Sequence, residues 1–492
     1  MSAPQHSALL TDLYELTMAQ AYWASGRADV EGVFYVSFRR GPFGGGHAIA
    51  CGLDDALARI ESFAFTRDDV AYLATLRAPD ETPVFRAGFL DYLSQFRIHL
   101  DVDAIPEGTP VFPFEPLLRV RGGLLEAQIV ETTVLNALNF PTLVATKAAR
   151  IVRAAGDAPV IEFGLRRAQG ADGGFTASRA AYIGGCAGTS NVLAGKEFGI
   201  PVRGTHAHSW VLSFDSEVEA FQSWSDTMPN ESVFLVDTYD TARGVEHAIE
   251  AGRALRAAGH ELQGIRLDSG DLAYLSIEAR VELDAGGFPG ARIMASNDLD
   301  EETIESLRLQ GAAIDTWGVG TKLVTADGQP ALGGVYKLAA MRRADGSWRH
   351  VLKVSEQPDK TTVPGILSVR RYYDEHGVAA GDAIVDELTA EARPLTIIHP
   401  TTPHRRKRLE DLPEHEELLQ PVMRDGRRLA PSPSVHEIRA RTRASLARFD
   451  PAVLRRVNPH AYPAGLESAL HQRRDALIDS VLVTERKPGP PG

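Results

Sequence analysis

The middle of the chain alternates short apolar runs with amphipathic segments of helical length. The apolar runs lie at residues 160–164, 199–204, 232–237, 264–268, 291–296 and 314–320. The last four begin 32, 27 and 23 residues apart, which is the spacing of strand–helix units. The runs are apolar on both faces, as the strands of a buried parallel sheet are. The pattern predicts six parallel strands connected by helices.

Polar residues or glycines lie at the C-terminal end of each of these runs. They include Arg166, Thr205, His206, His208, Asp237, Asp240, Arg266, Asp268, Ser296, Asn297, Asp298, Gly318, Gly320 and Thr321. In a β/α barrel the C-terminal ends of the strands form one face, and the active site lies there. A doubly wound sheet would gather its ligand mainly at one switch point. Six contributing strands therefore favour the barrel.

The segments on either side of this series have a different pattern of apolar and polar residues. Residues 13–25 have the pattern of an amphipathic helix, residues 53–97 are mostly helical, and residues 98–120 alternate strands with turns. We therefore predict an α/β protein whose irregular β/α barrel of parallel strands is flanked by two other parts. The predicted parts are an N-terminal α+β domain (1–130), the barrel with the active site (131–365), and a C-terminal extension that packs partly on the N-terminal domain (366–492).

Composition narrows the class of protein. The formal net charge of −13 argues against binding to nucleic acid or to an anionic membrane, because either partner requires a basic surface. No apolar run reaches the roughly 18–20 residues of a membrane helix, and the first 15 residues do not resemble a signal peptide. Two cysteines cannot form a disulfide framework. We expect a cytoplasmic enzyme with no nucleic-acid or membrane partner.

The residues at the strand ends favour a phosphorylated ligand. Arginine and glycine-rich turns at helix N-termini suit phosphate, and carboxylates suit either Mg²⁺ on a pyrophosphate or the orientation of a histidine. Each piece also has a purely structural interpretation, since residues 296–302 fit a capped helix start and residues 318–321 fit a plain turn. The sequence contains no P-loop, no strand-linked GxGxxG, no HExxH and no GxSxG motif.

In its motifs the chain resembles the nicotinate phosphoribosyltransferases, which belong to the type II phosphoribosyltransferases. The matching segments are TDLYELTMAQAYW (11–23), FRRGPFGGGHAIACGL (38–53), EFGLRRAQGADGG (162–174), TSNVLAG (189–195), GTHAHSW (204–210), VDTYDT (236–241), RLDSGD (266–271), ASNDLDE (295–301) and GVGTKL (318–323). They span about residues 9 to 340 in the family's order. Beyond about residue 395 no motif can be matched residue by residue.

The resemblance implies roles for the residues around GTHAHSW. His208 would be transiently phosphorylated by ATP, and Asp240 would orient it. His206 occupies the variable position of the motif and would be a supporting residue. Arg266 and Asp268 would bind ligand and groups on the pyrophosphate side.

Further roles carry over from the same resemblance. Tyr14 would stack on the pyridine ring, and Arg166 and Thr205 would hold the nicotinate end. The residues whose backbone N–H groups would cradle the sugar phosphate are Gly318, Gly320 and Thr321.

The implied reaction is phosphoribosyl transfer from phosphoribosyl pyrophosphate to nicotinate in NAD biosynthesis. It gives nicotinate mononucleotide and pyrophosphate, with ATP as cosubstrate, Mg²⁺ as cofactor and a ligase-type classification. The family also implies a homodimer with shared active sites. Two alternatives remain: a nicotinamide phosphoribosyltransferase on the same fold, and a non-catalytic homologue that binds phosphoribosyl pyrophosphate. The joint presence of His208, Asp240 and Arg266 argues against the second alternative.

Overall fold

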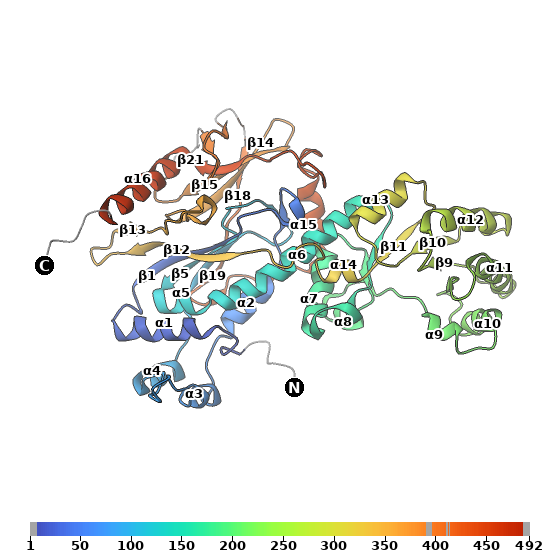
Figure 1. The fold of residues 1–492 in the computed structure, drawn as a ribbon, viewed down its shortest axis with the longest axis horizontal. Coiled ribbons are helices and arrows are strands. Elements are labelled where there is room, and N and C mark those ends of the chain that lie inside the picture. The colour runs from blue at the N-terminus through green and yellow to red at the C-terminus, as the bar shows by residue number, and fades with distance from the viewer. Residues whose placement is uncertain (1–6, 390–395, 410–411, 413, 486–492) are drawn as a thin grey trace. The chain divides into compact units, whose positions relative to one another are not determined.

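The computed structural model describes residues 7–389, 396–409, 412 and 414–485 (Figure 1). The chain divides into two compact units. Unit 1 comprises Met1–Thr142, Ala331–Pro433 and Arg441–Gly492, and unit 2 comprises Leu143–Pro330 and Ser434–Ala440. The first boundary falls inside the long helix α6 (Glu131–Ala155). These units are defined by compactness alone, and the three-part division predicted from the sequence stays a prediction.

Unit 2 is built on a six-stranded parallel sheet with the order β7-β6-β11-β10-β9-β8. The strands are β6 (Val160–Glu162), β7 (Gly188–Thr189), β8 (Val233–Leu235), β9 (Gly264–Leu267), β10 (Arg292–Ala295) and β11 (Thr316–Val319). Most of their residues are buried, as expected for parallel strands covered on both faces. The predicted α/β class with a parallel sheet is confirmed, and five of the six predicted runs contain strands.

The run at residues 199–204 is the exception. Within it only Val202 makes a bridge, parallel to Thr189, while the short strand β7 was not predicted. Pro201 has no backbone N–H, so the middle of the run cannot donate to a ladder. Among the described residues the sheet runs from β7 to β8 without a ladder that closes it, so a barrel is not confirmed.

Helices follow the strands of unit 2, and Figure 1 shows α11–α13 beside β9–β11. They are α7 (Gly170–Ile183), α8 (Val192–Phe198), α9 (His208–Val211), α10 (Glu217–Thr227), α11 (Thr241–Ala257), α12 (Leu272–Ala285), α13 (Glu301–Leu309) and α14 (Thr321–Val324). Asp240, Asp271 and Asp300 cap α11, α12 and α13 by accepting backbone N–H bonds. The caps explain why each helix begins a few residues after its strand.

Unit 1 contains two larger sheets and one small one. The first has the order β13-β12-β1-β5-β3-β19-β20, the second β17-β16-β21-β15-β14-β18, and β2 pairs with β4. The strands are β1 (Glu31–Ser37), β2 (Ala48–Ile49), β3 (Asp101–Ala104), β4 (Pro110–Val111), β5 (Leu118–Gly123), β12 (Val335–Arg342), β13 (Trp348–His350), β14 (Leu367–Tyr373), β15 (Ala379–Asp386), β16 (Thr396–Ile398), β17 (Arg406–Arg408), β18 (Glu414–Glu417), β19 (Gln420–Arg424), β20 (Arg427–Arg428) and β21 (Ala464–Glu467). In the first sheet β1 lies between β12 and β5, and β19 pairs with β3. Distant parts of the chain therefore build one sheet.

Along the chain, the helices of unit 1 precede, separate or follow the strands of these sheets. They are α1 (Leu13–Ala24), α2 (Leu53–Glu61), α3 (Arg67–Leu73), α4 (Ala87–Ser94), α5 (Leu124–Ile129), the first part of α6, the second half of α15 (Val435–Leu446), and α16 (Ser468–Glu485). The helix predicted over residues 13–25 is confirmed as α1.

A buried ion pair lies in unit 1 between β14 and β15. Arg371 donates from Nη2 to Asp382 Oδ2 at 2.6 Å, and both side chains are almost completely buried. Tyr462 donates to Asp382 Oδ1 at 2.7 Å. Close to this pair, burial and then the charge of Asp382 raise the pKa of the Glu115 carboxyl well above its usual range. The pair is satisfied internally, as a buried charge must be.

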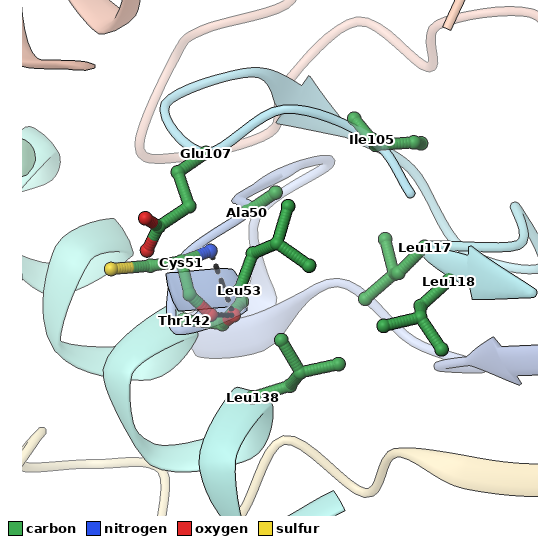
Figure 2. Close-up of a pocket in the computed structure, with 9 residues that line it drawn as sticks. All are labelled: Ala50, Cys51, Leu53, Ile105, Glu107, Leu117, Leu118, Leu138 and Thr142. Carbon is green, nitrogen blue, oxygen red and sulfur yellow. Dashed lines mark hydrogen bonds between the residues drawn. The ribbon is translucent and has the colours of Figure 1, made fainter. Parts of the chain in front are cut away.

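Unit 1 also contains a small cavity beside the start of α2 (Figure 2). It is lined by Ala50, Cys51, Leu53, Ile105, Glu107, Leu117, Leu118, Leu138 and Thr142. The space open to the centre of a water-sized sphere is about 10 Å³, which is room for one water molecule. Thr142 closes one side by hydrogen bonding to the backbone of Cys51. This cavity is a packing gap, too small for a substrate.

Candidate active site

Nine of the ten residues predicted for the site lie in unit 2, most of them in or within a few residues of a strand. They are Arg166, Thr205, His208, Asp240, Arg266, Asp268, Gly318, Gly320 and Thr321. Tyr14 lies in α1 of unit 1, where its side chain is half exposed. Its predicted stacking role stays a prediction.

Arg266 in β9 is the centre of the best-connected group. Its Nη1 donates to Thr205 Oγ1 at 3.0 Å, its Nη2 to Asp268 Oδ1 at 2.8 Å, and its Nε to Ser296 Oγ at 2.7 Å. The guanidinium also lies 5.8 Å from the centre of the Phe163 ring. The structure thus brings together residues from the ends of β6, β9 and β10 and from the loop before α9.

Asp268 connects this arginine to His208. Its Oδ1 accepts hydrogen bonds from Arg266 and Ser296, and its Oδ2 lies 3.8 Å from His208 Nε2. Burial opposes ionisation of Asp268, but the hydrogen bond from Ser296 and the charge of Arg266 outweigh it and lower the pKa of this carboxyl. A carboxylate therefore faces the histidine at neutral pH.

His208 is the first residue of α9, and its side chain is 40% exposed, so a substrate can reach it. Its Nδ1 lies 3.2 Å from Thr238 Oγ1. Asp240, expected to orient this ring, instead accepts the backbone N–H of Arg243 at 3.0 Å and is exposed. Within the described residues no contact joins Asp240 to His208. The neighbours of the ring are Thr238 and Asp268.

His206 is buried and has a different partner. Its Nε2 accepts the backbone N–H of Leu235 in β8 at 3.2 Å. Burial lowers the pKa of His206 to about 4, so the ring is neutral and can accept this bond. Because β8 is the last strand of the sheet, the His206 side chain satisfies a donor that a neighbouring strand would otherwise satisfy.

Gly318 in β11 and Gly320 after it are the glycines predicted for the site. A Cβ on Gly318 would lie 2.8 Å from Cδ2 of the Phe163 ring, so a larger residue would force this ring to shift. Gly320 precedes α14, and Thr321 is its first residue. Arg166 lies in a single 3-10 turn and is exposed. The phosphate and nicotinate contacts expected of these residues stay predictions.

Sequence reasoning did not single out two side chains of this group, Phe163 and Thr238, and it placed Ser296 at a strand end without giving it a contact partner. Thr238 also follows a strand and could have been found by that signal. Neither hydroxyl belongs to a motif that specifies its partner, so their contacts with Arg266 and His208 required the structure.

Asp237 is the residue best placed to meet a cation. Its Oδ2 accepts from the backbone N–H of Asp268 and from the hydroxyl of Ser269, while its Oδ1 is buried with no hydrogen-bond partner. No group of three or more His, Cys, Asp or Glu residues in the described chain is arranged to hold a metal. Mg²⁺ that enters with a pyrophosphate needs only one or two protein carboxylates. The donors of Asp237 and Asp268 fit such an ion.

No helix in the described part of the chain is both long and apolar enough to cross a membrane.

The parallel sheet and the arginine, carboxylates and histidine at its strand ends are typical of an α/β enzyme that acts on phosphorylated small molecules. The family comparisons are more specific. The chain matches the nicotinate phosphoribosyltransferase N-terminal domain over residues 9–139, the nicotinate phosphoribosyltransferase family over 159–372, and the C-terminal domain over 368–474. The chain belongs to the nicotinate phosphoribosyltransferase family.

Individual relatives agree with this assignment. The nicotinate phosphoribosyltransferase of Bacillus subtilis is 45% identical over 80% of this chain and 79% of its own, and that of Homo sapiens is 35% identical over 96% of each. The crystal structure of human nicotinic acid phosphoribosyltransferase matches with a TM-score of 0.79 at 31% identity, covering 95% of this chain and 99% of that one. The resemblance identified from the sequence is confirmed.

Proposed function

We propose that this chain transfers the phosphoribosyl group of phosphoribosyl pyrophosphate to nicotinate, giving nicotinate mononucleotide and pyrophosphate in NAD biosynthesis. The observation that carries the proposal is the match to the family in all three segments of the chain. The site agrees with it, because Arg266, Asp268 and His208 meet at the strand ends of unit 2.

In this reaction the ring nitrogen of nicotinate forms a bond to C1 of the ribose while the bond from C1 to the pyrophosphate oxygen breaks. Positive charge develops on the sugar and negative charge on the leaving group. Arg266 holds anionic groups with the N–H groups that its internal partners leave free. Asp268 contributes a fixed negative charge near the reacting centre. Mg²⁺, when bound with the pyrophosphate, neutralises part of the departing charge.

ATP coupling passes through His208 in this proposal. A ring nitrogen of His208 accepts the terminal phosphoryl group of ATP, ADP leaves, and later hydrolysis of the phosphohistidine restores the histidine. Exposure of the ring and its position between Thr238 and Asp268 support this role. The enzyme is then an ATP-dependent, ligase-type phosphoprotein. Thr205, held by Arg266, lies beside the same site.

We also propose that the parallel sheet of unit 2 is an irregular β/α barrel. The segment between β7 and α9 supports it, because Val202 bridges to Thr189 at one edge of the sheet and His206 reaches Leu235 at the other. This segment spans the opening that the ladders leave. The other proposed properties are a homodimer, as the family resemblance implies, and a cytoplasmic location, as the composition of the sequence indicates. Light scattering of the purified chain tests the first.

The deciding experiment is nucleotide-product analysis of the purified chain. We expect nicotinate mononucleotide from nicotinate and phosphoribosyl pyrophosphate, with faster formation when ATP and Mg²⁺ are added. Nicotinamide in place of nicotinate should give little product. Preferential use of nicotinamide would support the amide-specific alternative, and absence of any nucleotide product would support a non-catalytic binding protein.

A further inference from the structure

We propose that Ser296 is a positioning residue that locks Arg266 and Asp268 into one fixed pair, an inference that rests on the proposed function. Ser296 directly follows β10, and only 4% of it is exposed. Its hydroxyl contacts both charged groups, because Arg266 Nε lies 2.7 Å from Oγ and Oγ hydrogen bonds to Asp268 Oδ1.

The direction of both hydrogen bonds follows from the groups themselves. A guanidinium can only donate, and an ionised carboxylate can only accept. Ser296 therefore accepts from Arg266 with a lone pair and donates its single proton to Asp268. Asp268 Oδ1 also accepts from Arg266 Nη2 at 2.8 Å, so the three groups form a closed triangle. A side chain without a hydroxyl would leave a partly buried donor on Arg266 and a partly buried acceptor on Asp268 without this partner.

The triangle determines what the two charged groups present to substrates. Three of the five N–H groups of Arg266 are used by Ser296, Asp268 and Thr205, which leaves one on Nη1 and one on Nη2 for an anionic ligand. The free oxygen of Asp268, Oδ2, lies 3.8 Å from His208 Nε2. One hydroxyl thus fixes both the free N–H groups of the arginine and the carboxylate that faces the histidine. Groups held in place before binding need no reorganisation in the transition state.

The test compares Ser296→Ala and Ser296→Thr by steady-state kinetics with nicotinate and phosphoribosyl pyrophosphate. Ser296→Ala should lower kcat/KM about tenfold to a hundredfold, the usual range for a hydrogen bond to a charged group. The loss should include a higher KM for phosphoribosyl pyrophosphate, because the free N–H groups of Arg266 lose their fixed direction. Ser296→Thr retains the hydroxyl and should recover most of kcat/KM and the original KM.

The matched control is Ser276→Ala in α12. Ser276 is also fully buried, and its hydroxyl donates to Ala273 O and accepts from Ala313 N, so the substitution removes two comparable hydrogen bonds away from the site. It should lower thermal stability and leave kcat and KM unchanged. An equal loss of kcat/KM in Ser276→Ala would show that the effect of Ser296 is only structural.

A double substitution separates positioning from an independent contact. If Ser296 acts through Arg266, then Ser296→Ala together with Arg266→Lys should lose little more than Arg266→Lys alone. Additive losses, or a Ser296→Ala enzyme within twofold of wild type, would overturn the inference while wild-type product formation still supports the proposed function. If Ser296→Ala does not fold, Ser296→Cys replaces it and should show an intermediate loss. A wild-type chain that forms no product would overturn both proposals.

Discussion

His208 has a different polar neighbour at each ring nitrogen. Thr238 Oγ1 lies near Nδ1, and Asp268 Oδ2 lies near Nε2. A hydroxyl can donate or accept, whereas an ionised carboxylate only accepts. The carboxylate therefore favours a proton on Nε2, which leaves Nδ1 of the neutral ring unprotonated and able to attack a phosphoryl group.

This arrangement predicts where ATP labels the protein. His208→Ala should abolish labelling by γ-³²P ATP, and the wild-type label should be on Nδ1, as ³¹P NMR of the phosphopeptide at basic pH can distinguish. Asp268→Asn should slow labelling more than Asp240→Asn, because it removes the carboxylate that favours a proton on Nε2, whereas Asp240 caps α11 and Asn can also cap a helix. Label retained in His208→Ala would show that another residue accepts the phosphate.

The strand-to-helix connections of unit 2 depend on aspartate caps. Asp300 makes two kinds of contact at the start of α13. Its Oδ1 accepts the backbone N–H groups of Glu302 and Thr303. Its Oδ2 accepts from Lys322 Nζ at 2.7 Å. Burial opposes ionisation, but these donors lower the pKa of Asp300 to about 2. Asp271 caps α12 without a lysine partner among its described contacts, so the two sites form a natural comparison.

We expect Asp300→Ala to destabilise the protein by about 1–3 kcal/mol, since it removes a cap and leaves Lys322 without this partner. Asp271→Ala removes only a cap and should cost about 1 kcal/mol. Thermal unfolding midpoints at pH 7 measure the difference. Because the pKa of Asp300 is lowered, its contribution is present above the unfolded value near 4 and disappears as pH falls through about 2. Equal losses in the two variants would contradict a role for the ion pair.

The contact between His206 and β8 predicts a second pH effect with its own window. The folded pKa of about 4 lies below the unfolded value near 6.5, so the unfolded chain binds the extra proton between these pH values. Stability should therefore fall by up to about 3 kcal/mol as pH decreases from 6.5 to 4. His206→Gln, which cannot titrate, should show a flatter change of unfolding midpoint over the same range. An unchanged slope would assign the effect to other groups.

At the scale of helices and strands, the sequence predicts which elements form better than it predicts which residues contact one another. The apolar runs of β8–β11 and the aspartates before α11–α13 are local signals, so those elements were predictable. The two-residue strand β7 is too short to give a periodic signal, and the 199–204 run is apolar without forming a ladder. Likewise, the sequence could name His208, but the choice of Thr238 over Asp240 as its neighbour depends on the backbone path after β8.

For the molecule as a whole, the chain order and the order in space differ. Unit 1 combines three separated segments, and its first sheet places β1 against β12 and β3 against β19. Such pairings are set by long-range contacts, which leave no pattern in a single local stretch. The family resemblance identified from the sequence covered about residues 9 to 340, whereas the C-terminal family match extends to residue 474.

Breaking the buried pair of Arg371 and Asp382 should strongly destabilise unit 1. Asp382→Ala leaves a buried guanidinium without its carboxylate and should cost about 3–5 kcal/mol. Differential scanning calorimetry should show a lower transition for this variant. The exposed pair Arg40–Asp359 is the control, and Asp359→Ala should shift the transition little. A similar shift in both variants would contradict the prediction.

The pairing of strands that are distant in the sequence of unit 1 also affects how the chain folds during its synthesis. Translation proceeds from the N-terminus, so β1 leaves the ribosome long before β12 and β19 exist. At about 5–20 residues per second, β3 waits roughly fifteen seconds to a little over a minute for β19. Unit 2 is nearly continuous in the chain and can begin to fold during that wait. Nascent chains that stop before residue 420 therefore expose an unpaired edge of β3. The yield of folded protein should then depend on chaperones and on the speed of translation.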